Sequence, residues 1–440
     1  MKRLGAIFKK HIYLRNPVDI TGNYFAMTSK RYLLLVLILG ALTAIAPFSI
    51  DMYLPGFPQI AASLHTTTVQ VSLSLSGFFI GISAGQLLYG PLLDRFGRKK
   101  PLYIGLVLYI AASIGCFFVG SIEQLIVLRF IQAIGSCAAT VAAMAMVRDI
   151  FPVEDNAKVF ALLILILGVS PMLAPTVGGY ITAAYGWQLI FFILAAIAFL
   201  VLLAVIFLLP ESYQADPAYS LKPIPIITSF WSVMKHPQFY TYAVCGAIGF
   251  SGLFAYLAAS PFVFMDVYGI SAKVYGWIFA LLSIGFIGSS QFNGMLTRRY
   301  KSEQIVNVTL PAMVIIGIIF LIGSTGNWLG IYGTIITVFA FLCCVGITYP
   351  NTAALSLAPF GKNAGTAAAL MGCLQMAMGT LTSIVVSMFK SRSTIPMAGL
   401  MATAAVVAFL VLIIGRRNIR QRVEASEEVG AGVHQEGVHS

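Results

Sequence analysis

Residues 90–102 read Gly-Pro-Leu-Leu-Asp-Arg-Phe-Gly-Arg-Lys-Lys-Pro-Leu. This stretch is the most informative one in the chain for predicting the fold. It is a dense cluster of charge between two apolar runs, each long enough to cross a membrane as a helix. Such runs must be helical, because lipid offers backbone amides no hydrogen-bond partner. The stretch is therefore predicted to be a short loop between two membrane helices.

The composition extends this interpretation to the whole chain. Hydrophobic residues make up 59% of it and charged residues only 10%, against about 45–50% and about 25% in soluble domains. We predict an all-α membrane protein with twelve transmembrane helices in two pseudo-symmetric six-helix bundles. The expected spans are 32–54, 69–92, 101–119, 124–147, 158–182, 188–209, 238–264, 274–297, 305–324, 330–352, 364–389 and 396–415.

A proline-bearing stretch divides these spans into two halves. Five prolines fall between positions 210 and 237, in the only long connection between spans. We expect a cytosolic basic N-terminal segment at 1–31 and a cytosolic linker at 210–237. The two six-helix bundles are expected at 32–209 and 238–415, and a disordered cytosolic tail at 416–440.

The positive charge follows the predicted topology. The net charge is +12, and 23 of the 27 Lys and Arg residues fall in segments that face the same side if both termini are cytosolic. Cytoplasmic loops carry this excess of Lys and Arg in membrane proteins. The charge is thus attributed to membrane orientation, and no nucleic-acid partner is expected.

Enzymatic chemistry finds little support in the residues. All six cysteines lie inside expected helices, and the five histidines lie in the tails, an outer loop and the linker. No metal-ligand spacing, nucleophile–base set or Walker loop is present. We expect no catalytic residues, no metal and no cofactor other than protons as the coupling ion.

The two halves resemble each other in sequence. Residues 81–100 align with 285–304, matching Gly81 to Gly285 and Gly90 to Gly294. Ala46-Pro47-Phe48 with Asp51 and Tyr53 likewise parallels Ser260-Pro261-Phe262 with Asp266 and Tyr268. Weak internal symmetry of this kind is typical of secondary transporters.

Two ionisable residues stand out inside the first half. Asp51 lies near the outer end of the first span, and Arg129 lies about two turns into the fourth. Charged groups at membrane depth are costly and are functional candidates by default. The two are predicted to share a depth and to be able to pair, so that Asp51 binds and releases a proton. A static ion pair, or Asp51 capping a helix end, is the structural alternative.

Residues 90–102 resemble the loop signature of the major facilitator superfamily, G-x-L-x-D-R-x-G-R-K-x-x-L, at every specified position. The resemblance implies a cytosolic latch that stabilises an outward-open state. Its residues would be Gly90, Asp94, Arg95, Gly97, Arg98 and Lys99. The stretch around Arg129 and Gln132 resembles a second signature of the superfamily, with Ala133 replacing a glycine.

The fifth span resembles the antiporter signature of the same superfamily. It carries Pro171, Ala174, Pro175, Gly178 and Gly179, with Ala-Pro in place of the usual Gly-Pro. The prolines remove backbone hydrogen bonds and the glycines allow close helix approach, which predicts a bend and a tight contact. A packing kink alone is the structural alternative. Together with residues 51–55, these features resemble the Bcr/CflA branch of drug:proton antiporters.

The resemblance implies a substrate path lined by spans 1, 4, 7 and 10. Adaptable methionines and aromatic residues suit promiscuous apolar ligands, although most such residues in membrane proteins face lipid or core. The candidates are Phe48, Gln132, Met144, Met172, Phe254, Tyr256 and Tyr349.

The function expected from these features is proton-coupled efflux of drugs or other small amphipathic molecules by alternating access. The alternatives are a dedicated exporter of a native metabolite such as an amino acid or siderophore, and an uptake symporter. A channel or a membrane enzyme fits the pattern less well. The expected partners are the lipid bilayer, protons and a small-molecule substrate. We expect a monomer in a bacterial inner membrane with both termini cytosolic.

Overall fold

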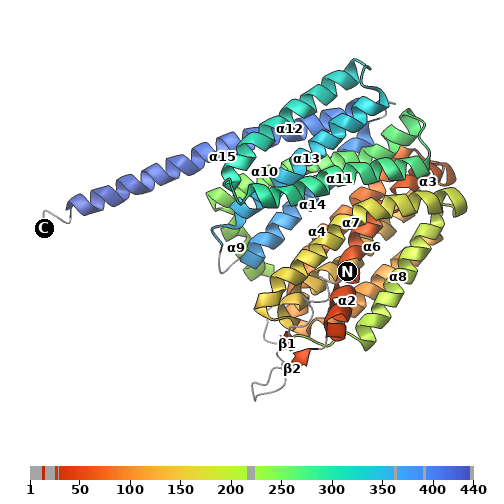
Figure 1. Cartoon of the computed structure of the whole chain (residues 1–440), viewed down its shortest axis with the longest axis horizontal. Coiled ribbons are helices and arrows are strands. Elements are labelled where there is room, and N and C mark those ends of the chain that lie inside the picture. The colour runs from red at the N-terminus through yellow and green to blue at the C-terminus, as the bar shows by residue number, and fades with distance from the viewer. Residues whose placement is uncertain are drawn as a thin grey trace, which may run out of the picture. The chain divides into compact units, whose positions relative to one another are not determined.

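A computed structural model describes residues 12–14, 25–27, 29–215, 223–360, 364–389 and 393–436 (Figure 1). The first half of the chain contains β1 Ile12–Leu14, β2 Phe25–Met27, α2 Ser29–Asp51, η1 Leu54–Gly56, α3 Phe57–Ser63, α4 Thr68–Phe96, α5 Lys99–Phe117, α6 Ile122–Ile150, α7 Val153–Tyr185 and α8 Gln188–Phe207. The second contains α9 Pro223–Met234, α10 Pro237–Pro261, η2 Phe262–Val267, α11 Ala272–Leu296, α12 Ser302–Thr325, α13 Gly330–Leu357, α14 Ala364–Met388 and α15 Ile395–Glu436.

Within the described residues, twelve helical segments are long and apolar enough to cross a membrane. This confirms the predicted number of spans and the all-α membrane architecture. Strands β1 and β2 are short and lie in the expected N-terminal segment, where they pair antiparallel with Ile12 opposite Met27. The first span includes α2, η1 and α3, so Asp51 lies inside it.

The chain forms two compact units. The first unit comprises Met1–Leu221, Ala258–Ser283 and Ser383–Arg392, and the second comprises Lys222–Leu257, Ile284–Thr382 and Ser393–Ser440. Segments 258–283 and 383–392 therefore group with the N-terminal helices, whereas the expected bundle boundaries assign them to the C-terminal half.

Helix α6 is the centre of the first unit. It packs extensively on both α4 and α5, which contact each other much less. Small residues make this close packing possible: a Cβ on Gly81 of α4 would lie 2.6 Å from the Ala133 Cβ, and Gly105 of α5 lies directly against Ala138. Small residues at helix interfaces are a common basis of helix association in membranes.

The aligned positions of the two halves have matching surroundings in the structure. Gly81 and Gly285 are both tightly packed, whereas a Cβ added to Gly90 or to Gly294 would meet nothing within 4 Å. These positions lie in different units, so each environment arises independently. The shared pattern supports the internal duplication predicted from the sequence.

The duplication also explains an irregular segment. Asp51 follows Pro47 by four residues, whereas Asp266 follows Pro261 by five. The second copy adopts a π-helix at this point, η2, in which the Tyr268 amide donates to the Val263 carbonyl oxygen at 3.1 Å. A π-helical turn accommodates one extra residue in a helix and is frequent at functional sites.

Two predicted loop regions contain helix. Helix α9 lies in the expected linker, where Val233 is buried with Phe239, Ala243 and Ala367 in the second unit. Helix α15 continues to Glu436, which corrects the expected disorder of residues 416–440 for all but the last four, and these lie outside the described residues. Ala, Arg and Glu have high helix propensity, and their frequency after Gly415 favours continuation of the helix.

Candidate functional site

Arg129 is the most deeply buried charged residue of the first unit, with 0% of its surface exposed. It lies on α6, and its Nη1 donates to Gln132 Oε1 at 2.5 Å, one turn further along the same helix. Its Nη2 donates to the Ser49 carbonyl oxygen of α2 at 2.8 Å, while Nε is buried without a hydrogen-bond partner. The guanidinium thus joins the first and fourth spans.

Aromatic rings surround the same guanidinium. Its central carbon lies 4.2 Å from the ring centre of Tyr53 and 4.1 Å from that of Phe78, with Phe191 at 5.8 Å. A cation over an aromatic face gains most when both are desolvated. Because arginine stays protonated in proteins, these rings enclose a permanent positive charge within the membrane span.

A chain of hydrogen bonds extends this site into α5. Gln132 Nε2 donates to Ser113 Oγ at 2.7 Å, and Ser113 Oγ donates to the Tyr109 carbonyl oxygen at 2.7 Å. The hydroxyls of Tyr109 and Ser49 share a hydrogen bond of 2.6 Å. The network therefore returns to Ser49 of α2, whose carbonyl oxygen binds Arg129. Gln132, predicted as a cavity residue, is fully buried and engaged in this network.

Asp51 is buried at the last residue of α2, with 4% of its surface exposed. It lies close enough to Tyr275 of α11 to interact with it electrostatically, and the Tyr275 hydroxyl in turn shares a hydrogen bond of 2.8 Å with Ser260. All three residues belong to the first unit. No ion pair between Asp51 and Arg129 occurs among the described residues, so the pairing considered from the sequence is not formed in this structure.

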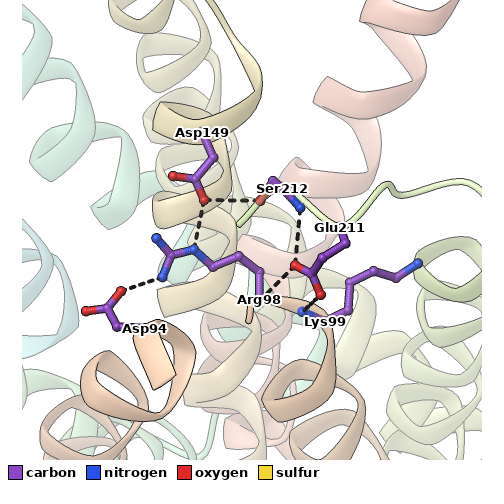
Figure 2. A network of polar contacts seen from close by, with 6 residues as sticks. All are labelled: Asp94, Arg98, Lys99, Asp149, Glu211 and Ser212. Atoms are coloured by element: carbon purple, nitrogen blue, oxygen red, sulfur yellow. Dashed lines mark hydrogen bonds and ion pairs between the residues drawn. The ribbon is translucent and has the colours of Figure 1, made fainter. Parts of the chain in front are cut away.

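A second cluster of polar residues lies at the loop between α4 and α5 (Figure 2). Arg98 Nε donates to Asp149 Oδ2 at 2.8 Å, and Arg98 Nη1 donates to Asp94 Oδ1 at 2.7 Å. The Arg98 side chain is 9% exposed and that of Asp149 16%. Burial alone would lower the pKa of Arg98, but the hydrogen bonds and charges of Asp149 and Asp94 outweigh it and raise this pKa.

The Glu211 side chain holds the same loop by binding backbone amides of the loop. Its carboxylate accepts hydrogen bonds from the amides of Arg98 at 2.9 Å and Lys99 at 3.1 Å, at the beginning of α5 (Figure 2). An anion is favoured at a helix N-terminus, where amides are unpaired. Gly97 has a φ of 82° and lies against Glu211, so a side chain there would be strained and would crowd the carboxylate.

The sequence-based latch therefore contains only part of the network. Asp94, Arg98 and Lys99 take part in it, whereas Gly90 has open space around it. The Arg95 guanidinium lies 5.6 Å from the centre of the Phe96 ring. Asp149, Glu211 and Ser212 were missed; Ser212 Oγ donates to Asp149 Oδ2 at 3.1 Å. The available signal was that the missed acids flank the ends of α6 and α8, at the same predicted membrane face as the loop.

The antiporter-like residues lie in α7, which continues through both Pro171 and Pro175. Gly178 lies against the Met52 carbonyl, and a Cβ on Gly179 would lie 2.5 Å from the Ala272 carbonyl oxygen. Conversely, Gly276 of α11 lies against Pro175, and Thr176 Oγ1 donates to the Gly276 carbonyl oxygen at 3.2 Å. Ala174 is buried. The glycines thus form a close contact between α7 and α11 within the first unit.

The remaining cavity candidates are divided between the units. Phe48, Met144 and Met172 are half-buried in the first unit, and Phe254, Tyr256 and Tyr349 belong to the second. Tyr349 donates from its hydroxyl to Gln375 Oε1 at 2.8 Å, and its ring centre lies 4.6 Å from that of Phe250. Gln375 was not predicted because it lies in the eleventh span, outside the expected path. Phe250 lies in the expected seventh span, but the sequence does not distinguish it from the other aromatic residues there.

Comparison with known proteins agrees with this architecture. The model of the Major Facilitator Superfamily matches residues 39–383. A Bacillus subtilis (strain 168) protein named as an uncharacterized MFS-type transporter, YdgK, is 31% identical over 386 residues, covering 87% of this chain and 95% of that protein. A bicyclomycin resistance protein homolog of Haemophilus influenzae is 28% identical over 394 residues, covering 89% of this chain and 99% of its own.

A solved structure shares the fold. The crystal structure of a D-xylose–proton symporter superposes with a TM-score of 0.70 at 14% identity, covering 86% of this chain and 97% of that one. At this identity the likeness concerns the fold alone. The resemblance inferred from the sequence motifs, including that to the Bcr/CflA type, is confirmed by the family match and the resistance-protein relative.

Proposed function

Because this chain belongs to the major facilitator superfamily of membrane transporters, we propose that it exports drugs or other small amphipathic molecules in exchange for protons. Transport would proceed by alternating access between two six-helix halves, with both termini in the cytosol of a bacterium. A relative named for bicyclomycin resistance supports drugs as the cargo. The tight α7–α11 contact suits a helix pair that separates and re-forms during the cycle.

The main support comes from two buried ionisable residues of the first and fourth spans, Asp51 and Arg129. Arg129 is fully buried among aromatic rings without a carboxylate partner among the described residues, and Asp51 is buried in the same unit. Isolated buried charges are expensive and are retained for a use. We assign proton binding to Asp51, and to Arg129 the fixed positive charge that biases it.

Coupling requires that Asp51 hold its proton in one conformation and lose it in another. A change between conformations in the surroundings of Asp51, including its exposure and the influence of the Arg129 charge, supplies that difference. Arg129 contacts Ser49, two residues from Asp51, so a movement of α2 against α6 acts on both. The half-buried aromatic cluster of Phe250 and Tyr349, with the Gln375 amide, is proposed as the drug-contacting surface of the second unit.

The test is efflux from cells or inverted vesicles with and without a proton gradient, beginning with bicyclomycin. The wild type should lose efflux when the gradient is collapsed, and Arg129→Ala and Asp51→Asn should both lack it. Efflux that is unchanged in both variants would contradict the assigned roles. If the protein moves no drug but does export a native metabolite, the dedicated-exporter alternative is favoured instead.

A further inference from the structure

A groove in the first unit lies outside every site described above. It has a volume of about 260 Å³ and is lined by Tyr89, Leu92 and Phe96 of α4 and by Lys100, Pro101 and Ile104 of α5. Apart from the Lys100 ammonium and the Tyr89 hydroxyl, its lining side chains carry only apolar atoms. The groove is thus an apolar trough whose lining includes one cationic residue, Lys100.

The groove follows from the way the helices pack. Helices α4 and α5 each pack closely on α6 and contact each other little, so a space remains between them. It begins beside the loop at Phe96 and Lys100 and extends about two turns into α4, to Tyr89, and about one turn into α5, to Ile104. Ile104 is 68% exposed on this face, as expected for a residue in contact with lipid tails.

The positive charge of Lys100 has no partner within the described part of the protein. Among three consecutive basic residues, Arg98 is bound by Asp94 and Asp149, and Lys99 Nζ donates to the Leu209 carbonyl oxygen at 2.7 Å. The Lys100 side chain is exposed and makes no hydrogen bond or ion pair with any other described residue. An exposed lysine in the first turn of a membrane span, beside the loop from the preceding span, can contact a lipid headgroup.

We propose that this groove binds an anionic phospholipid, with one acyl chain between α4 and α5 and the headgroup phosphate on Lys100. The apolar lining matches a hydrocarbon chain, and the unpaired ammonium matches the phosphate charge. The bound lipid would lie beside the loop that Arg98 and Glu211 hold in place. It would therefore stabilise the α4–α5 junction from the membrane side.

The experiment uses tryptophan fluorescence of the full chain in vesicles. Phe96→Trp places a reporter in the groove, and Tyr103→Trp provides a second one that leaves the lining intact. Each variant is reconstituted in vesicles of unbrominated phosphatidylcholine. One sample contains a minor fraction of phosphatidylglycerol with brominated acyl chains, and the other contains the same fraction of brominated phosphatidylcholine. The parent protein supplies the background of the four native tryptophans.

Brominated phosphatidylglycerol should quench the reporter more strongly than brominated phosphatidylcholine. Lys100→Gln should weaken this preference by about fivefold, the contribution of one lysine near an anionic headgroup. Lys301→Gln, an exposed lysine at the beginning of α12, should leave it unchanged. Equal quenching by the two lipids, or an undiminished preference in Lys100→Gln, would overturn the proposal.

Discussion

Arg129 carries a positive charge inside the membrane span, and a few neighbouring residues compensate the cost of burying it. Its guanidinium is enclosed by aromatic faces and donates to the Ser49 carbonyl and to Gln132. Both the planar shape and the forked donors are used, and lysine offers neither. The identity of this residue, beyond its charge, should therefore matter for transport.

Arg129→Lys should fold but transport poorly. Lysine keeps the charge, yet it leaves buried acceptors unpaired, at a cost of about 1–3 kcal/mol. This cost corresponds to a fall in gradient-driven efflux of about fivefold to about 140-fold, since about 1.4 kcal/mol is a factor of ten. Arg417→Lys, at an exposed position of α15, is the matched control and should transport normally. Full activity of Arg129→Lys would show that charge alone suffices.

Asp149→Asn should destabilise the protein more than Asp155→Asn. Asp149 faces a largely buried guanidinium, whereas Asp155 pairs with Lys158, whose side chain is 71% exposed. Removing a partner from the former pair should cost about 1–3 kcal/mol, below the value for fully buried pairs. The exposed pair should contribute about 0–1 kcal/mol. Thermal unfolding of the purified variants measures the difference, and equal shifts would contradict the importance of the Arg98 network.

The contact between helices α7 and α11 depends on the absence of side chains at their glycines. Gly179 faces Ala272, and Gly276 faces Pro175 and Thr176, so each helix presents backbone to the other. The one-residue insertion absorbed by η2 lies just before α11 in the chain. The second half of the duplication thus differs from the first beside this contact.

Gly276→Val should loosen the contact, because a Cβ there would lie 2.8 Å from the Pro175 carbonyl oxygen. With Thr176→Cys as a reporter, labelling by a membrane-impermeant maleimide from outside the cell should increase. Gly288→Val is the control on the same helix, since a Cβ there meets nothing within 4 Å. Similar labelling in the two valine variants would mean that the contact does not control access to Thr176.

Across the chain, hydropathy was sufficient to predict the twelve spans, because a lipid bilayer requires long apolar helices. The loop signature likewise led to Arg98 and Asp94. The partners Asp149 and Glu211 are distant in sequence and carry no periodic signal, so only folding brings them to Arg98. The aromatic enclosure of Arg129 was missed for the same reason: Tyr53, Phe78 and Phe191 come from three separate segments.

Antiport through Asp51 requires that drug binding favour the conformation in which Asp51 loses its proton. The most direct measurement is proton release on drug addition to the purified protein in weakly buffered detergent, followed with a pH-sensitive dye. The wild type should release protons when a transported drug binds, and Asp51→Asn should release none while still unfolding at the same temperature. Binding of a transported drug to the wild type without proton release, or equal release from Asp51→Asn, would show that Asp51 is not the coupling residue.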